Sequence, residues 1–169
     1  MDILNKLETW LAGVYKGAPK LSPGAKKSIT GVWPIVALVF GVLQLLAAYE
    51  LWHWGHQVNQ MANLVNSFAQ YTGATNLGVH LNIFYWLSLI VLAVEGVVLL
   101  LAYPGLKNHL KSGWNYLFYG AILNLVYGVF SAFNNYGGAS SLVMQVIVSA
   151  IVLYFLFQIR DQYAGTKSA

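Results

Sequence analysis

Glu95 is the side chain best placed to do chemistry, because it is the one charged residue in the apolar stretch 83–103. A stretch of that length can cross the hydrocarbon of a membrane, where a carboxylate costs about 2.5–3.5 kcal/mol on insertion scales. No lysine or arginine lies in the apolar stretches to pair with it. We therefore expect a neutral acid that is hydrogen-bonded to amide side chains. A protonatable group at this depth could instead relay a proton or a cation, and the sequence leaves both roles open.

Other apolar stretches carry polar residues at a depth close to that of Glu95. Counted from the lysine- or arginine-flanked end of its stretch, each of four residues lies 9 to 11 positions deep: Gln44, Glu95, Asn124 and Ser149. At a rise of ~1.5 Å per helical residue, these depths agree to within about 3 Å. The pattern predicts one hydrogen-bonded layer, which Gln145 extends by one helical turn. Interhelical hydrogen bonds contribute about 0.6 kcal/mol each, so a structural role is the preferred interpretation of the uncharged members.

Glycines share the helical faces of these polar residues. Gly41 lies one turn from Gln44, and Gly120 and Gly128 lie one turn on either side of Asn124. Small residues let membrane helices approach each other closely. We therefore expect these three glycines to be helix-packing positions.

An acid and two histidines form the pattern that most suggests a metal. Glu50 and His53 are three residues apart, and His80 precedes the stretch 83–103. Di-iron carboxylate bundles need the Glu-x-x-His spacing twice, together with further glutamates, and only one copy is present. The three residues could hold zinc, or the histidines could ligate haem, but a hydrated polar ring is the preferred interpretation. We expect no metal and no cofactor.

The composition is that of a protein whose solvent is a lipid bilayer. Of its 169 residues, 58% are hydrophobic and 8% are charged, whereas a soluble domain has about 25% charged residues. A soluble chain this poor in charge could not cover its surface with polar groups. The absence of cysteine excludes disulfides and thiolate metal sites. No Walker loop, nucleophile elbow or catalytic-triad spacing is present, so we do not expect an enzyme.

Four stretches are long and apolar enough to be membrane helices, at about 33–54, 83–103, 114–133 and 141–159. Pro34 suits the first turn of a helix, and Pro104-Gly105 is expected to end the second span. Residues 134–138 are expected to form a turn between the last two spans. The sequence therefore predicts an all-α fold, a four-helix antiparallel transmembrane bundle.

The basic residues predict the orientation of this bundle. All nine lysines and arginines lie before the first span, between the second and third, or after the fourth, and the segments 55–82 and 134–140 have none. By the positive-inside rule, both termini and the 104–113 loop are cytoplasmic. The positive charge also attracts anionic lipid. No basic cluster is interleaved with stacking aromatics, so we do not expect nucleic acid as a partner.

Two segments outside the spans have the apolar spacing of amphipathic helices, residues 2–16 and residues 56–71. The first is expected to lie in the cytoplasmic interface or to contact a partner, and the second to be a short helix in the first outer loop. Residues 17–31 have the composition of a linker. The expected organisation is an amphipathic helix and basic linker at 1–31, a four-span domain at 32–160 and a cytoplasmic tail at 161–169.

Three strings resemble small, uncharacterised four-span membrane proteins of bacteria: Trp33-Pro34 at the start of the first span, LNLVYGVF at 123–130 and LYFLFQIR at 153–160. The resemblance covers about residues 33–163 and implies a location in the cytoplasmic (inner) membrane, but it assigns no functional residue. We expect a non-enzymatic membrane protein that associates with itself or with other membrane proteins. The alternative is a small oligomeric transporter or channel in which Glu95 handles a proton or cation.

Overall fold

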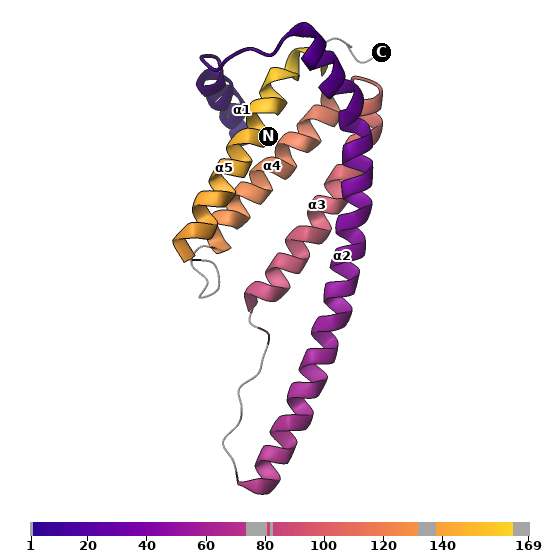
Figure 1. The fold of residues 1–169 in the computed structure, drawn as a ribbon, viewed down its shortest axis with the longest axis vertical. Helices are drawn as coiled ribbons and strands as arrows, with labels where there is room; N and C mark the ends of the chain where they lie inside the picture. Colours follow the sequence, from indigo (N-terminus) through magenta and orange to yellow (C-terminus); the bar gives the residue numbers. More distant parts are fainter. Residues whose placement is uncertain (1, 74–80, 82, 132–137, 164–169) are drawn as a thin grey trace.

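The computed structural model describes residues 2–73, 81, 83–131 and 138–163, and within these ranges the regular structure is entirely helical (Figure 1). The helices are α1 (Asp2–Tyr15), α2 (Pro23–Thr72), α3 (Ile83–Lys107), α4 (Lys111–Ser131) and α5 (Gly138–Gln158), followed by the 3₁₀ turn η1 (Arg160–Tyr163). The expectation of an all-α fold is thus confirmed for these ranges. Two of the helices, α2 and α3, are long and apolar enough to cross a membrane. Residues 143–158 of α5 form a shorter apolar helix.

Helix α2 begins inside the segment that we interpreted as a linker, so the linker is shorter than 17–31. The Ser22 hydroxyl accepts a hydrogen bond from the Ala25 N–H at 3.2 Å, and Pro23 occupies the first helical turn. Serine at the N-cap followed by proline is a strong helix start, because the hydroxyl satisfies a free backbone donor and proline has none to lose. The Gly/Ala/Lys composition of this segment concealed that signal.

The short helix expected at 56–71 is not separate, because α2 continues through it to Thr72. Gly55 is the one helix-weakening residue near the junction, and a glycine inside a helix costs only about 1 kcal/mol. It is also covered, since a Cβ built on Gly55 would lie 2.9 Å from Cε1 of Tyr85. The helix ends where Gly73 adopts φ 69°, a left-handed conformation that favours glycine.

Pro104-Gly105 does not end α3, which continues to Lys107. The Pro104 carbonyl accepts the Asn108 N–H at 3.1 Å, and the Gly105 carbonyl accepts the Leu110 N–H at 2.8 Å. Proline removes only its own donor, so the helix can close a further turn beyond it. The expected turn at 134–138 lies outside the described residues except for Gly138, which belongs to α5.

Helices α2 to α5 run alternately in opposite directions, and each packs on the next one along the chain (Figure 1). The best-packed core lies at the end of the bundle where α3 joins α4. Its fully buried large side chains come from α3, α4, α5, η1 and the junction between α5 and η1: Leu106, Trp114, Phe118, Leu156, Ile159 and Tyr163. The Trp114 indole donates to the Leu156 carbonyl at 2.8 Å and so links α4 to α5 inside this core.

Helix α1 lies across the same end of the molecule, against α5 (Figure 1). Leu11 joins the buried core, and the Tyr15 hydroxyl donates to the Ala150 carbonyl at 3.0 Å. Burial raises the pKa of Tyr15 above its usual value. Glu8 is buried and pairs with Arg160 and Lys111. Leu7 and Leu11 of the apolar stripe of α1 therefore pack on the protein's own core, whereas Ile3, Trp10 and Val14 remain exposed.

Candidate functional site

The polar residues singled out by depth lie together in the interior of the bundle. Nε2 of Gln44 on α2 donates to Oε2 of Glu95 on α3 at 3.5 Å. The Asn124 side chain on α4 also interacts with the Glu95 carboxyl group. The Gln145 amide on α5 donates to the Asn124 side chain and, at 3.3 Å, to the Asn124 backbone carbonyl. A chain of side-chain contacts thus connects α2, α3, α4 and α5.

A cavity of about 240 Å³ lies at this layer. Its polar lining residues are Trp33, Gln44, Glu95, Asn124 and Ser149. Glu95 is 7% exposed and Ser149 is 5% exposed. Leucine, valine and alanine side chains from α3, α4 and α5 complete the wall. The layer therefore forms the polar side of a partly open, mainly apolar pocket between the helices, and apolar surroundings favour a neutral acid over a carboxylate.

Three of the lining residues have a buried polar atom with no hydrogen-bond partner among the described residues: Nε1 of Trp33, Oε1 of Gln44 and Oε1 of Glu95. An unsatisfied buried polar group costs about 1–3 kcal/mol. A neutral Glu95 carboxyl group would reduce this cost, because its own O–H can donate a hydrogen bond to an acceptor such as the side-chain oxygen of Gln44. The set of one indole donor and two oxygen acceptors could equally bind a small polar molecule or a cation.

The packing glycines differ in how closely they are contacted. A Cβ on Gly41 would lie 3.1 Å from the backbone oxygen of Gly96, and one on Gly128 would overlap the Gln145 side chain. A Cβ on Gly120 would lie 3.6 Å from Val98, which is ordinary contact. Close approach therefore requires glycine at Gly41 and Gly128, whereas Gly120 has room for a methyl group.

The sequence interpretation missed Trp33 and Gly96 as members of this site. Trp33 lies at helical spacing from Ala37, Gly41 and Gln44, which is a signal for a shared helix face. Gly96 adjoins Glu95 and faces Gly41 across the α2–α3 contact.

The weak metal candidates do not form a described site. Glu50 and His53 are exposed on α2, with the His53 ring stacked on Tyr49 at 6.5 Å, and His80 lies outside the described residues. Within the part of the chain that the structure describes, no group of three or more His, Asp or Glu side chains is close enough to hold a metal ion.

Comparison with known proteins adds no relative: no family model, curated protein or solved structure matches the chain. The function must therefore be argued from the residues and their geometry.

Proposed function

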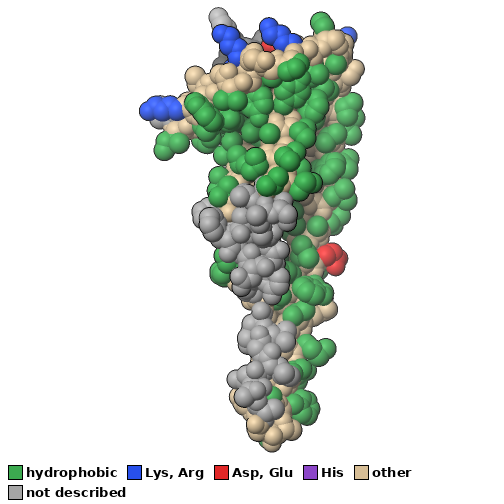
Figure 2. Space-filling model, turned by 60° about the vertical axis from the view of Figure 1, so that its left-hand side comes forward, with side chains coloured by type: hydrophobic (Ala, Val, Ile, Leu, Met, Phe, Trp, Pro, Cys, Tyr) green, Lys and Arg blue, Asp and Glu red, His purple; other side chains and the backbone are tan. Residues whose placement is uncertain are grey.

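We propose that the chain is a non-enzymatic integral membrane protein that crosses the cytoplasmic membrane of a bacterium four times and acts by self-association. The first support is the outer surface of the helices. Large apolar side chains are exposed along α2, α3 and α5, among them Ile35, Leu46, Ile90 and Ile151, and Figure 2 shows hydrophobic side chains over much of one face. Such a surface is stable against lipid and costly against water. Helix α4, with 21 residues, has the length of a span, and its Asn124 side chain lines the cavity between the helices.

The distribution of charge supports the proposed orientation. Lysine and arginine side chains gather at the end of the molecule that holds the buried core (Figure 2). Four of them lie around one pocket there: Lys16 from the segment after α1, Lys26 from α2, Lys111 from α4 and Arg160 from η1. By the positive-inside rule this end faces the cytoplasm.

The observation that carries the assembly proposal is the length of α2. Its 50 residues span about 75 Å, more than twice the ~30 Å of hydrocarbon. If residues 33–54 cross the membrane, residues 55–72 extend about 27 Å beyond it on the outer side. Figure 1 shows this part of α2 projecting past the ends of α3, α4 and α5.

An apolar stripe follows this projecting part of α2. Met61, Leu64, Phe68 and Tyr71 are 64%, 60%, 71% and 92% exposed. Their spacing of three, four and three residues is the a/d spacing of a coiled-coil seam. The polar residues beside them are uncharged glutamines, asparagines and serine, so a second α2 can approach without charge repulsion. Two copies with the same membrane orientation would bring identical stripes together in parallel.

Single cysteines test this proposal cleanly, because the chain has no cysteine of its own. Leu64→Cys and Phe68→Cys lie on the stripe, and Asn63→Cys and Gln70→Cys lie on other exposed faces at the same height. We expect mild oxidation in membranes to give covalent dimers at 64 and 68 and few at 63 and 70. Equal yields at all four positions, or none at any, would contradict self-association through this face. Cross-links to a different protein would instead favour a hetero-complex.

A second candidate function is that of a small oligomeric transporter or channel that uses Glu95. The Oε1 atoms of Glu95 and Gln44 at this cavity have no hydrogen-bond partner among the described residues, and they favour this function because such oxygens could contact a passing proton or cation. The test is pH-driven flux in proteoliposomes. Under this hypothesis Glu95→Gln folds normally and loses the flux, because an amide cannot release a proton at usable pH. If the chain acts by self-association alone, neither the parent protein nor Glu95→Gln gives pH-driven flux.

A further inference from the structure

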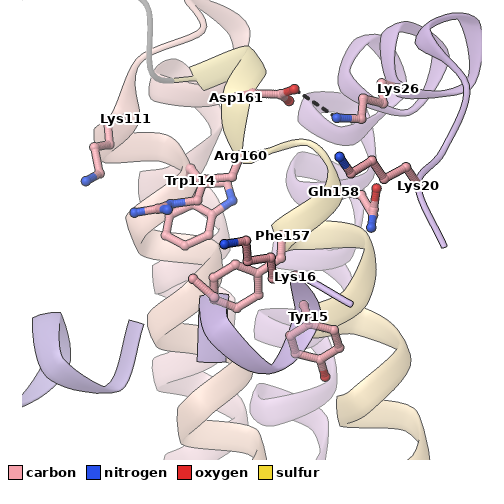
Figure 3. A pocket seen from close by; sticks show the side chains of 11 residues that line it. Tyr15, Lys16, Lys20, Lys26, Lys111, Trp114, Phe157, Gln158, Arg160 and Asp161 are labelled. Atoms are coloured by element: carbon pink, nitrogen blue, oxygen red, sulfur yellow. Dashed lines mark hydrogen bonds and ion pairs between the residues drawn. The ribbon is translucent and has the colours of Figure 1, made fainter. Parts of the chain in front are cut away.

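We propose that a pocket at the basic end of the molecule binds the phosphate group of an anionic phospholipid; this inference rests on the proposed membrane location. The pocket has a volume of about 640 Å³. Side chains reach it from α1, from the segment before α2, and from the adjoining ends of α4 and α5 (Figure 3). It is separate from the polar cavity around Glu95.

Positive charge exceeds negative charge in this pocket. Five cationic side chains line it: Lys16, Lys20, Lys26, Lys111 and Arg160. Two carboxylates offset them, because Asp161 pairs with Lys26 at 2.8 Å and Glu8 pairs with Arg160 and, at 3.7 Å, with Lys111. Among the described residues, no carboxylate pairs with Lys16 or Lys20. These two ammonium groups are therefore available to a phosphate.

The segment that carries Lys20 is fixed in place by hydrogen bonds. The Gln158 side chain accepts from the Leu21 N–H at 3.1 Å and donates to the Pro19 carbonyl at 3.2 Å. The Tyr154 hydroxyl donates to the same carbonyl at 2.7 Å. The backbone on both sides of Lys20 is thus tied to α5, which holds its side chain at the pocket (Figure 3).

Aromatic rings line the pocket between these cationic side chains. Tyr15 stacks on Phe157 with 5.4 Å between ring centroids, and Phe157 packs edge-on against Trp114 at 5.6 Å. The Arg160 guanidinium lies 5.6 Å from the Trp114 ring centroid. A pocket that combines cationic groups with exposed aromatic carbon matches a lipid, whose phosphate joins an apolar glycerol ester and acyl chain. Free phosphate would use only the cationic groups.

Location supports the lipid as the source of the phosphate. In the proposed orientation the pocket lies at the cytoplasmic interface, where anionic lipids are concentrated and each nearby lysine or arginine favours their binding. Phe157 and Trp114 belong to helices that enter the membrane, so an acyl chain could continue from the pocket along α5 into the bilayer.

The test uses the full-length protein purified in a neutral detergent and titrated with short-chain phosphatidylglycerol, short-chain phosphatidylcholine or inorganic phosphate. The pocket variant is the double substitution Lys16→Gln/Lys20→Gln. The matched control is Lys27→Gln/Lys107→Gln, which removes the same charge from the same end of the molecule but from residues that do not line the pocket. The circular dichroism and elution volume of each variant establish that it is folded.

We expect phosphatidylglycerol to bind at least tenfold more tightly than phosphatidylcholine, and the pocket variant to lose about tenfold in that affinity while the control changes less than twofold. Equal losses in both variants, or no loss in either, would overturn the proposal. Inorganic phosphate that binds as tightly as phosphatidylglycerol would overturn the lipid assignment. Extraction of the expressed protein from vesicles by alkaline carbonate tests the membrane location separately, so the two failures are distinguishable.

Discussion

Alanine at Gly96 should weaken the contact between α2 and α3, and the size of the effect can be worked from the structure. A Cβ there would lie 2.9 Å from Cγ of Leu45 and 3.1 Å from the Gly41 backbone oxygen. Leu45 can rotate away, but the backbone oxygen moves only if the two helices separate. Overpacking of this kind costs about 1–3 kcal/mol. Replacing a helical glycine by alanine also returns about 1 kcal/mol of helix propensity, which partly offsets that cost.

Gly120→Ala is the matched control, because its Cβ would meet Val98 at the ordinary distance of 3.6 Å. The propensity gain is common to both variants, so their difference in unfolding free energy isolates the clash at about 1–3 kcal/mol. Reversible unfolding in mixed micelles, followed by the fluorescence of the six tryptophans, measures it. If Gly96→Ala and Gly120→Ala unfolded at the same denaturant fraction, the close α2–α3 approach would be wrong.

Substitutions at three other positions have defined outcomes. Glu95→Gln keeps the shape and most hydrogen bonds of a neutral acid, so its unfolding free energy should change by less than ~1 kcal/mol, whereas Glu95→Lys should greatly reduce the yield of folded protein in membranes. Burial raises the pKa of Tyr163 from 10.0 to about 12. The stabilisation that the neutral, buried phenol gives to the fold is therefore fully present below pH 10 and is lost as the pH rises towards 12. Tyr163→Phe removes a buried hydroxyl that has no hydrogen-bond partner among the described residues, so its unfolding free energy at neutral pH should equal or exceed that of the parent. In a pH series the parent should lose about 2–3 kcal/mol at alkaline pH that the variant does not lose. Burial alone would raise the pKa of Asp161, but the hydrogen bond and charge of Lys26 outweigh burial and lower this pKa below its ordinary value. The pair therefore stabilises the fold at pH values above the ordinary carboxyl pKa, and this stabilisation is lost as the pH falls below that pKa. Because Asp161 is exposed, Asp161→Asn should change an acid unfolding curve by no more than ~0.5 kcal/mol.

The helices could be predicted because apolar stretches and helical spacing are local signals. The ends of the helices were harder to predict, because a few helix-breaking residues must outweigh the tendency of the whole segment to continue as a helix. Gly55 weakens α2 too little to stop it, and Pro104 is compatible with another turn when Gly105 and Gly113 pack closely behind it. Ser22-Pro23 was a readable start signal that composition obscured.

The polar layer was predictable because depth in a membrane can be counted along the chain. Counting placed Gln44, Glu95, Asn124 and Ser149 at one height, and all four line one cavity. Counting cannot give the rotation of each helix about its axis. The inclusion of Trp33 and the contact of Gly96 with Gly41 depend on that rotation, as does the spare room at Gly120.

The basic pocket could not be predicted from sequence, because its walls are far apart in the chain. Glu8 and Arg160 are 152 residues apart, and their ion pair forms only when α1 folds back on α5. The amphipathic pattern of residues 2–16 indicates that one face seeks apolar surroundings. It does not distinguish a lipid interface from the protein's own core.

The central claim is a four-span membrane protein with its basic end in the cytoplasm, and cysteine accessibility tests it most directly. Ser28→Cys and Ser112→Cys lie at the basic end, and Ser67→Cys lies on the projecting part of α2; all three positions are exposed. A membrane-impermeant maleimide added to bacterial spheroplasts should label the cysteine at 67 at once, and those at 28 and 112 only after lysis. Labelling at 112 before lysis would contradict the orientation, and labelling of all three before lysis would contradict the membrane assignment itself.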